Sequence, residues 1–575
     1  RRREPSTGNE FRAAVYSDAE VVGLIEGCGQ RCAPAAQFGR IDTARDGDVL
    51  CFRMNRHTAR SGAIKFEREV VLAVVHSRAL DALRSPQVTV EVHLANGLPS
   101  FTLVGLADTE VKEARERVRA ALQTSGLEFP NNKRITVNLA PADLPKESGR
   151  FDLPIALGIL AASDQIDAAK LARFEFAGEL SLAGELRPVR GALAMALAAA
   201  HEGVDPPRAM VLPTESASQA ARVDGVAIHA AAHLLEVVRS LLPGDSAEPL
   251  PSAVPAAVAP PPSRGDLRDV RGQSGAKRAL EIAAAGGHSV LMVGPPGSGK
   301  SMLAQRFAGL LPPLTHDESI ESAALLSLTG AAAAHTWGER VLRSPHHSAS
   351  SAALVGGGSP PRPGEISLAH HGVLFLDELP EFQRHALEAL REPLETGRVT
   401  ISRAARQADF PARFQLLAAM NPCPCGHLGS ALRACRCTPD VVARYQGRLS
   451  GPLLDRIDLQ VEVPAVAATT LADAPGGDSS AAMALRVAQA RGRALQRQGV
   501  LNRELAGESL ERHCTLDAAA SNFLQSVSVR LGWSARGFHR VLRIARSIAD
   551  LAGSEAIVLA HVAEAVQYRR VLAVQ

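Results

Sequence analysis

The chain has 575 residues, of which 46% are hydrophobic and 4% aromatic, and its formal net charge at pH 7 is +3. This length predicts about three or four domains with packed cores. The small net charge excludes a chain-wide basic field, so any contact with DNA must come from a local patch. The chain has no run of about 18 uncharged apolar residues, and its eight cysteines do not follow the pattern of a secreted disulfide framework. We therefore expect a cytoplasmic protein without a membrane span.

The first 69 residues differ in pattern from the rest of the chain. They begin with three arginines, lack an initial methionine and show no sustained periodicity. One interpretation is an Arg-rich targeting arm. A regular strand pattern begins abruptly at Leu72, so we favour translated sequence upstream of the true start, with Val70 or Val71 as the real first residue. We expect residues 1–69 to be poorly ordered and without function.

Residues 70–242 alternate between strand and helix patterns, which indicates an α/β domain. The expected strands are residues 88–94, 101–104 and 134–139, with a tight strand pair at 179–186. The expected helices are residues 109–125, closed by Gly126, then 154–162 and 192–202. Residues 243–264 are rich in Pro, Ala and Ser, which predicts a linker.

A glycine-rich loop follows the apolar strand pattern at residues 289–293 and precedes a helical pattern at 302–307. Its glycines let backbone N–H groups approach a polyphosphate, and the helix N-terminus adds a positive dipole end. A chance turn is the alternative, but this order of strand, loop and helix favours a site for ATP with Mg²⁺. Lys300 is expected to reach the β and γ phosphates, and Ser301 to ligate Mg²⁺. The predicted phosphate-binding residues are Gly294, Pro295, Pro296, Gly297, Ser298, Gly299, Lys300 and Ser301.

A second apolar strand pattern, residues 373–376, ends in Asp377 and Glu378. At the carboxyl end of a parallel strand, Asp377 would hold Mg²⁺ through water and Glu378 would polarise the attacking water. The alternative is a buried strand followed by a solvated acidic turn. The phosphate loop upstream favours the catalytic interpretation.

A cluster of four cysteines lies within residues 423–437, as two Cys-x-Cys pairs. Four thiolates can close a tetrahedral structural Zn²⁺ site. The spacing is tighter than the usual Cys-x-x-Cys knuckle, so buried cysteines and a redox pair are alternatives. We expect zinc, held by Cys423, Cys425, Cys435 and Cys437.

The chain resembles the ComM/YifB family of magnesium-chelatase-like AAA+ proteins over about residues 72–571. Outside the ATPase motifs, the resemblance rests on residues 74–80, 103–106, 144–154 and 178–182. It implies a multidomain α/β protein with a Lon-protease-like domain (S5 domain 2-like), an AAA+ P-loop core and a C-terminal helical lid. The corresponding ranges are 70–242 for the Lon-like domain, 265–464 for the core with its cysteine insert at 423–437, and 465–575 for the lid.

A Lon-type protease requires a serine nucleophile and a lysine base in this fold. Ser148 lies near the matching stretch, but apolar residues such as Leu193 occupy the position of the lysine. Without a base to take its proton, a serine hydroxyl is a poor nucleophile. We therefore expect a non-proteolytic scaffold.

The resemblance also implies roles for residues outside the phosphate loop. Asn421, after the strand at 416–420, would orient the lytic water, although a turn-forming Asn before a proline is the alternative. Arg456 would act as an arginine finger in the neighbouring subunit, and Arg536 would contact the nucleotide. Residues 269–285 would cover the adenine. If Arg456 acts in trans, hydrolysis requires a ring, expected to be a hexamer.

Two segments of the resemblance suggest DNA contact. Residues 344–365 and 395–403 correspond to loops that face the central pore in related helicases. Arg398, Arg403 and Arg406 would supply positive charge for phosphates. A metal site at His346 and His347 is a weaker interpretation than a loop, because no cysteine or paired carboxylate is near in sequence.

The resemblance thus implies an ATP-driven DNA translocase or helicase that promotes branch migration in homologous recombination and natural transformation. One alternative is a magnesium-chelatase motor subunit, although such subunits lack the Lon-like domain. An ATP-dependent protease is another, against which the missing serine–lysine pair argues. An assembly factor that makes no DNA contact is the third.

Overall fold

The computed structural model describes residues 72–81, 83–105, 108–144, 146–202, 207–258, 265–329, 337–358, 361–403, 406–430, 433–466 and 477–569. The predictions made for residues 1–69 lie outside the described residues. Within the described part, no helix combines the length and apolar character needed to cross a membrane.

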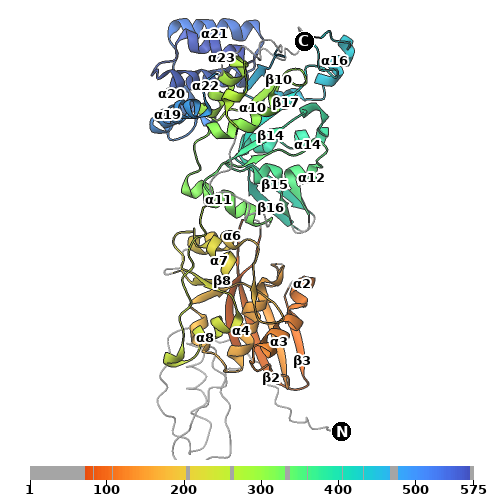
Figure 1. Cartoon of the computed structure of the whole chain (residues 1–575), viewed down its shortest axis with the longest axis vertical. Helices are drawn as coiled ribbons and strands as arrows, with labels where there is room; N and C mark the ends of the chain where they lie inside the picture. Colours follow the sequence, from red (N-terminus) through yellow and green to blue (C-terminus); the bar gives the residue numbers. More distant parts are fainter. Residues whose placement is uncertain are drawn as a thin grey trace, which may run out of the picture. The chain divides into compact units, whose positions relative to one another are not determined.

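The first half of the described chain is built on a seven-stranded mixed sheet (Figure 1). β1, β2 and β4 pair antiparallel, and the outer strands join in parallel. Every second residue of β2 is buried, as its predicted alternation requires. In spatial order the strands are β3 (Ser100–Val104), β4 (Lys133–Ala140), β2 (Gln87–Asn96), β1 (Leu72–Arg78), β5 (Phe174–Phe176), β8 (Ala209–Pro213) and β9 (Ile228–Ala231).

The helix α4 (Asp152–Ala162) is buried along its whole length and packs on β1 and β2. A side chain at Gly158 would place its Cβ 2.5 Å from a methyl carbon of Val92, so glycine permits this close helix–sheet approach. The predicted buried helix is therefore confirmed. The predicted strand pair is present as β6 (Glu179–Leu180) and β7 (Leu186–Arg187). Further helices of this half are α5 (Ala168–Leu171), α6 (Ala192–His201), α7 (Thr214–Ala220) and α8 (Leu234–Ser240).

The single helix predicted over residues 109–125 is wrong. The chain forms α2 (Thr109–Lys112) and α3 (Ala114–Thr124), with a break at Glu113. α2 contacts the turn at Gly149–Phe151, whereas α3 packs on α4.

Part of the predicted linker also belongs to the first sheet. The backbone N–H of Ala230 donates to the carbonyl of Pro251 (3.1 Å), and that of Ala253 donates to the carbonyl of Ile228 (2.8 Å). Leu250 packs against the adjoining core. Proline cannot donate to a strand, but its carbonyl can accept, so a Pro-rich segment can line a sheet edge.

A second sheet has five strands, all parallel, in the order β11-β14-β17-β10-β18. Its strands are β10 (Val290–Val293), β11 (Leu342–Arg343), β14 (Val373–Leu376), β17 (Gln415–Met420) and β18 (Leu459–Glu462). All residues of β10, β14 and β17 are buried, which explains their uninterrupted apolar runs. The predicted α/β class with parallel strands is confirmed. The carboxyl ends of these strands share one edge, where ligands bind in open α/β sheets.

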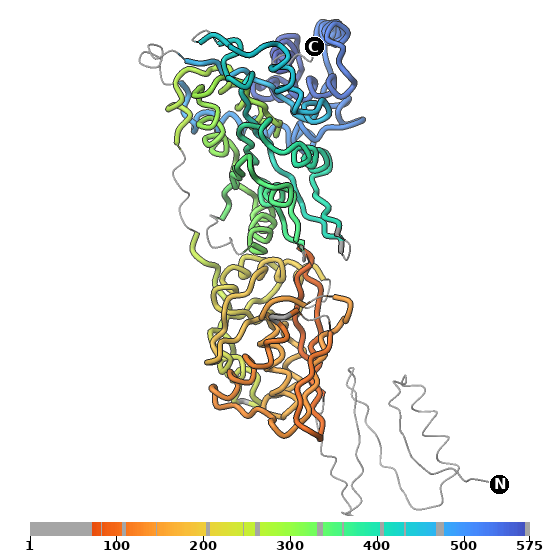
Figure 2. Tube along the Cα trace, turned by 90° about the vertical axis from the view of Figure 1, so that its right-hand side faces the viewer, coloured from red at the N-terminus to blue at the C-terminus, as the bar shows by residue number. Residues whose placement is uncertain are grey.

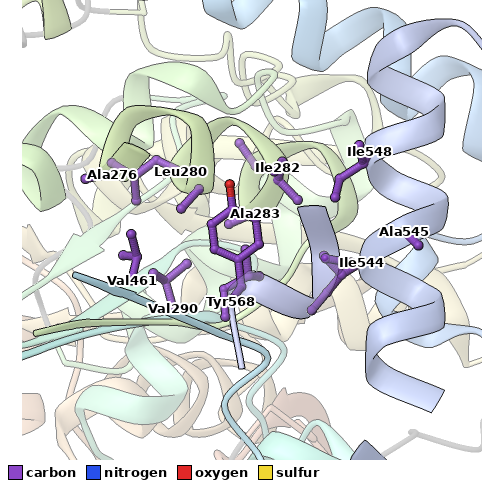
Figure 3. Close-up of a cluster of buried hydrophobic side chains, with 14 of the residues drawn as sticks. Ala276, Leu280, Ile282, Ala283, Val290, Val461, Ile544, Ala545, Ile548 and Tyr568 are labelled. Atoms are coloured by element: carbon purple, nitrogen blue, oxygen red, sulfur yellow. The ribbon is translucent and has the colours of Figure 1, made fainter. Parts of the chain in front are cut away.

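Helices from distant parts of the chain pack beside this sheet. Figure 3 shows α9 (Ser274–Gly286), β10, β18 and α22 (Ala535–Ala552) contributing to one apolar cluster, which includes Leu280, Val290, Val461 and Ile544. The C-terminal helices lie close together in the blue part of the trace (Figure 2). They are α19 (Ser480–Gln498), α20 (Gly507–His513), α21 (Ala518–Arg530), α22 and α23 (Leu559–Gln567).

Candidate nucleotide-binding site

A cavity of about 380 Å³ lies at the carboxyl edge of the second sheet. The loop after β10, the acidic pair after β14 and the residue after β17 meet around it. This volume is typical of a small-molecule or cofactor site. Its lining residues are Pro296, Gly297, Ser298, Gly299, Lys300, Ser301, Met302, Asp377, Glu378, Met420 and Asn421.

The loop wraps the N-terminus of α10 (Lys300–Phe307). Gly297 and Gly299 have φ angles of +75° and +93°, in the left-handed region that favours glycine. A Cβ at Gly294 would lie 2.0 Å from the carbonyl oxygen of Val463, so only glycine fits at this crossing. Residues 297–302 line the cavity, so the N-terminus of α10 borders it, as an anion site requires.

Lys300 is buried and bonds across the site. Its Nζ donates to the carbonyls of Gly294 (2.8 Å) and Pro295 (2.9 Å) and to Oδ1 of Asn421 (3.2 Å). Burial lowers the pKa of Lys300, and the nearby Asp377 and Glu378 charges oppose that shift. Gly294 and Pro295, predicted to bind phosphate, therefore contact the lysine through their carbonyls and do not line the cavity.

Ser301 and Asp377 meet on one side of the cavity. Ser301 Oγ donates to Oδ2 of Asp377 over 2.6 Å, and the backbone N–H of Glu378 donates to Oδ1 of Asp377 over 2.9 Å. A hydroxyl and a carboxylate oxygen are hard ligands of the kind that Mg²⁺ prefers. These two residues fit a Mg²⁺ site completed by water and substrate phosphate oxygens.

The side chain of Glu378 has a partner that the sequence did not predict. Nδ1 of His347 lies 3.0 Å from Oε2 of Glu378. His347 belongs to the loop between β11 and α12 (Ser351–Val355), so the two residues are separated by a long stretch of chain. No local sequence pattern could have revealed this pair.

The four clustered cysteines converge as predicted for a metal site. Cys423 Sγ lies 3.4 Å from Cys425 Sγ, and Cys435 Sγ lies 3.6 Å from each of them. All four Sγ atoms, including that of Cys437, lie within 4.8 Å of one another. A tetrahedral Zn²⁺ with Zn–S bonds near 2.3 Å would separate its sulfurs by about 3.8 Å. The donor set therefore fits zinc.

Backbone N–H groups favour thiolate at Cys425, whereas desolvation and the adjoining thiols raise the pKa of Cys435 and Cys437. The backbone N–H groups of Arg436 and His427 hydrogen-bond to Cys425 and lower the pKa of its thiol to about 6. The backbone N–H of Leu428 donates to Cys423 Sγ over 3.3 Å. Such donors stabilise the anionic sulfur that metals bind.

The cysteine segment touches the phosphate loop directly. Gly426 has a φ of +79°, and a Cβ there would lie 2.4 Å from Cδ of Pro296. Asn421, which lines the cavity, lies two residues before Cys423. The cysteine cluster and the cavity thus share a wall.

A second group of candidate metal ligands comprises Glu321, His370 and His371. Nε2 of His370 and of His371 lie 3.1 and 2.8 Å from Oε2 of Glu321, and these contacts lower the pKa of the glutamate. Nδ1 of His370, however, accepts the backbone N–H of Arg413 (3.0 Å). The proton of His370 therefore resides on Nε2, the nitrogen that faces Glu321, which leaves that nitrogen no lone pair for a metal. A metal-bound histidine usually donates a hydrogen bond from its other nitrogen, whereas Nδ1 of His370 accepts one. This arrangement is a hydrogen-bonded network that anchors the start of β14.

Arg456 and Arg536 do not line the cavity of their own chain. Both meet Glu395, whose Oε1 lies 2.7 Å from Nη2 of Arg456 and 3.5 Å from Nη1 of Arg536. Arg456 also donates to the carbonyls of Arg391 (3.1 Å) and Pro452 (2.8 Å). The side chain of Arg456 is 9% exposed and that of Arg536 is 66% exposed, so Arg456 is the more restricted of the two.

Ser148, in the first half of the chain, bonds to an arginine. Nε of Arg150 donates to its Oγ over 3.0 Å, and burial lowers the pKa of Arg150 to about 10. Lys146 Nζ donates instead to the carbonyl of Pro141. These contacts do not form the serine–lysine pair of a Lon-type protease.

Comparison with known proteins places the chain in a family. Three family models match: Subunit ChlI of Mg-chelatase over residues 90–216, Magnesium chelatase, subunit ChlI over 266–471, and Magnesium chelatase, subunit ChlI C-terminal over 477–569. Competence protein ComM of Haemophilus influenzae is 50% identical over 503 residues, covering 87% of this chain and 97% of the relative. YifB of Salmonella typhimurium is 49% identical over 502 residues, with the same coverage.

A more distant relative is the Magnesium-chelatase 38 kDa subunit of Cereibacter sphaeroides. It is 27% identical over 220 residues, which cover 36% of this chain and 56% of the relative. The parallel sheet, the phosphate loop and the family matches define a magnesium-chelatase-like protein of the AAA+ class. Within that class the chain belongs to the ComM/YifB family. This membership supports an ATPase of the ComM type.

The contact between Gly426 and Pro296 predicts that replacing Gly426 weakens nucleotide binding. Gly426→Ala would push the phosphate loop away and is expected to raise the Kd for an ATP analogue several-fold. Gly429→Ala is a matched control, because Gly429 has a φ of +75° and open space around its Cβ position. Calorimetric titration of both variants separates the contact from general backbone strain. Equal affinities in the two variants would contradict a functional contact.

Proposed function

We propose that this protein is an ATP-hydrolysing, ring-forming DNA translocase that promotes branch migration in homologous recombination and natural transformation. The cavity that unites Lys300, Ser301, Asp377, Glu378 and Asn421 carries the ATPase part. The DNA part rests on the likeness to a protein named for competence and on the hairpin described below. A cytoplasmic location stays a prediction.

In this proposal Lys300 exchanges its loop carbonyls for the β and γ phosphates of ATP. Ser301 and Asp377 hold Mg²⁺, directly and through water. Glu378 polarises the attacking water, and Asn421 orients it. Gln273 supports the loop, because its Nε2 donates to the carbonyls of Ser298 (3.0 Å) and Pro464 (2.7 Å).

The second part of the proposal is a site shared between subunits of a ring, which we propose is a hexamer. Arg456 and Arg536 both form ion pairs with the carboxylate of Glu395, and neither lines the cavity of its own chain. We propose that both serve the nucleotide of the neighbouring subunit, where guanidinium groups offset charge that develops on the phosphates.

The third part concerns DNA. β15 (Arg398–Arg403) and β16 (Arg406–Pro411) form an antiparallel hairpin, with Arg403 paired to Arg406. Val399 and Ile401 are buried in the adjoining core, whereas Arg398 and Thr400 are exposed. One face of the hairpin is thus anchored. The other carries Arg398, but also the exposed carboxylate of Asp409, which accepts a hydrogen bond from Thr400 (2.7 Å). The proposed contact with backbone phosphates therefore depends on Arg398 and on Arg403 and Arg406 at the end of the hairpin.

The fourth part is a structural Zn²⁺ held by Cys423, Cys425, Cys435 and Cys437. The convergence of the four sulfurs supports it. Bound zinc would fix the segment that joins Asn421 to Gly426, and so brace one wall of the cavity.

Two alternatives are less well supported. The magnesium-chelatase subunit of Cereibacter is 27% identical over 36% of this chain, whereas ComM of Haemophilus is 50% identical over 87% of it, so a chelatase subunit is less well supported. A protease would require a base beside Ser148, where the chain places Arg150. A third alternative is an assembly factor that makes no DNA contact, and the experiment in the next paragraph tests it.

We expect branched DNA to stimulate ATP hydrolysis, and the protein to dissociate a fluorescent four-way junction in the presence of ATP. Lys300→Ala should lower both activities by about a hundredfold, because the variant lacks the buried positive charge that would contact the transferred phosphoryl group. Unstimulated ATPase together with an intact junction would refute the translocase. That result would favour the assembly factor.

Mixing inactive variants tests the shared site. Lys300→Ala lacks its own phosphate contact but keeps both arginines, whereas Arg456→Ala and Arg536→Ala keep the phosphate loop. Mixtures of Lys300→Ala with either arginine variant should regain ATPase activity, because one subunit supplies what its neighbour lacks. Activity that stays at the sum of the separate proteins, while mixed rings form by native mass spectrometry, would place that arginine in cis.

Metal analysis tests the cysteine cluster. Protein purified under reducing conditions is expected to contain about one zinc ion per chain. Cys435→Ser should lose most of the metal and lower the melting temperature, because three ligands remain. Cys514→Ser is the control, since Cys514 is buried apart from the cluster. Absence of zinc in the unaltered protein would refute a metal site.

A further inference from the structure

The backbone of Arg456 lies at the end of the second sheet that is opposite to the candidate nucleotide site. β10 and β18 run parallel with Val290 opposite Leu459, and Arg456 comes three residues before Leu459, where β18 begins. The cavity lies beyond the other end of β10, after Val293. At about 3.3 Å per residue, the four-residue strand separates the two places by on the order of 13 Å. The segment that carries Arg456 is therefore positioned by contacts outside the cavity.

Asp458 joins this segment to the base of β10. Its Oδ2 accepts the backbone N–H of Ser289 (3.0 Å) and lies 3.0 Å from the Ser289 hydroxyl. The backbone N–H of Asp458 donates in return to Ser289 Oγ over 2.9 Å. The same hydroxyl lies 3.2 Å from the carbonyl oxygen of Arg456. These reciprocal bonds tie the backbone before β18 to the strand that leads into the phosphate loop.

Asp458 also faces the helix that carries Arg536. Arg536 and Arg540 lie four residues apart in α22 and therefore share one face of that helix. Nε of Arg540 lies 3.7 Å from Oδ1 of Asp458, and its Nη1 donates to the carbonyl of Ile457 over 3.4 Å. Arg569, which follows α23, donates to the same carbonyl over 2.8 Å. One carboxylate is thus in contact with the structures that place both arginines of the proposed shared site (α22 and α23 are labelled in Figure 1).

The charge of Asp458 lies largely inside the protein. Its side chain is 16% exposed, and that of the adjoining His288 is 1% exposed. Burial opposes ionisation, but His288, Arg540 and Ser289 outweigh it and lower the pKa of this carboxyl below its usual value. Removing the charge would leave Arg540 without an ion pair in the described part of the chain, and would release the contact that aligns α22 with the segment before β18.

We propose that Asp458 is a positioning residue, which holds Arg456 and Arg536 in the geometry that the nucleotide of the neighbouring subunit requires. This inference rests on the proposed sharing of the site between subunits. Asp458 does not touch the nucleotide of its own chain, because it lies at the end of the sheet away from the cavity. Loss of its charge should therefore slow hydrolysis in the next subunit and leave nucleotide binding in its own cavity unchanged.

The test introduces Asp458→Asn into either partner of a mixed protein. Arg456→Ala supplies an intact phosphate loop and Lys300→Ala supplies the arginines, so the ATPase activity of their mixture is the reference. Asp458→Asn in the Lys300→Ala chain should lower that activity about five- to tenfold, because this chain presents the arginines. The same substitution in the Arg456→Ala chain should leave the activity nearly unchanged, because that chain only has to bind ATP. Native mass spectrometry checks that mixed assemblies form.

Two further variants separate positioning from folding. Ser289→Ala removes the hydroxyl that contacts Asp458 and should show the same dependence on which chain carries it. Asp550→Asn is the control, because Asp550 is a buried carboxylate at the far end of α22, where it pairs with Arg497 over 2.6 Å. This control should lower the melting temperature and affect both placements equally.

An equal loss in both placements of Asp458→Asn, or no loss in either, would overturn the positioning role. If the reference mixture regains no activity, the shared site fails, and Asp458→Asn alone then decides the role of Asp458. In that protein, a lower kcat with an unchanged Kd for an ATP analogue would retain the positioning role. An unchanged kcat, or weaker binding of the analogue, would overturn it.

Discussion

The buried ammonium of Lys300 is the constraint around which the candidate site is arranged. A charged group cannot remain buried without partners, and here they come from two neighbouring strands. The carbonyls of Gly294 and Pro295 follow β10, and the amide of Asn421 follows β17. The lysine therefore joins the ends of two strands and draws the glycine loop into its curved shape. Phosphate oxygens could replace these acceptors without leaving the charge unpaired.

The two walls of the cavity receive contacts from segments that do not themselves bind nucleotide. On one side Gly426 of the cysteine segment presses on Pro296, and on the other His347 reaches Glu378. The first contact can affect the shape of the phosphate loop, and hence binding. The second brings the segment after β11 to the carboxylate that is proposed to polarise water. The cavity is thus bordered by contacts from two segments that lie far from the phosphate loop in sequence.

The sequence predicted those parts of the site that follow strand ends. Asp377 and Asn421 come directly after runs of buried residues, and Lys300 follows such a run after the glycine-rich loop. Parallel strands bring these positions to one edge. The cysteine cluster was predicted because its ligands are close in sequence. The pair of His347 and Glu378 could not be predicted, since it depends on how a long insertion folds back.

The fold shows the same division. Apolar runs and alternating patterns identified the strands and α4, because burial on one or both faces determines those patterns. The break at Glu113 was missed, since it depends on two different packing partners. The pairing of Pro251 with β9 was missed because the composition alone suggested a linker. The backbone N–H of Ala230, at the edge of the sheet, donates to the Pro251 carbonyl.

Glu395 bears on the proposed site between two subunits, because it is the partner that Arg456 and Arg536 share in the single chain. Its carboxylate compensates the charges of Arg456 and Arg536 in the single chain, which holds both guanidinium groups together. A neighbouring triphosphate carries more negative charge than one carboxylate and would compete for the same two arginines. Arg456 would give up its bond to Glu395 but could keep those to the carbonyls of Arg391 and Pro452, so its orientation would persist. Within the described part of the chain, Arg536 has no comparable anchor and is largely exposed, so it would move further. On this argument Arg456 would set the geometry of the proposed shared site and Arg536 would add charge to it.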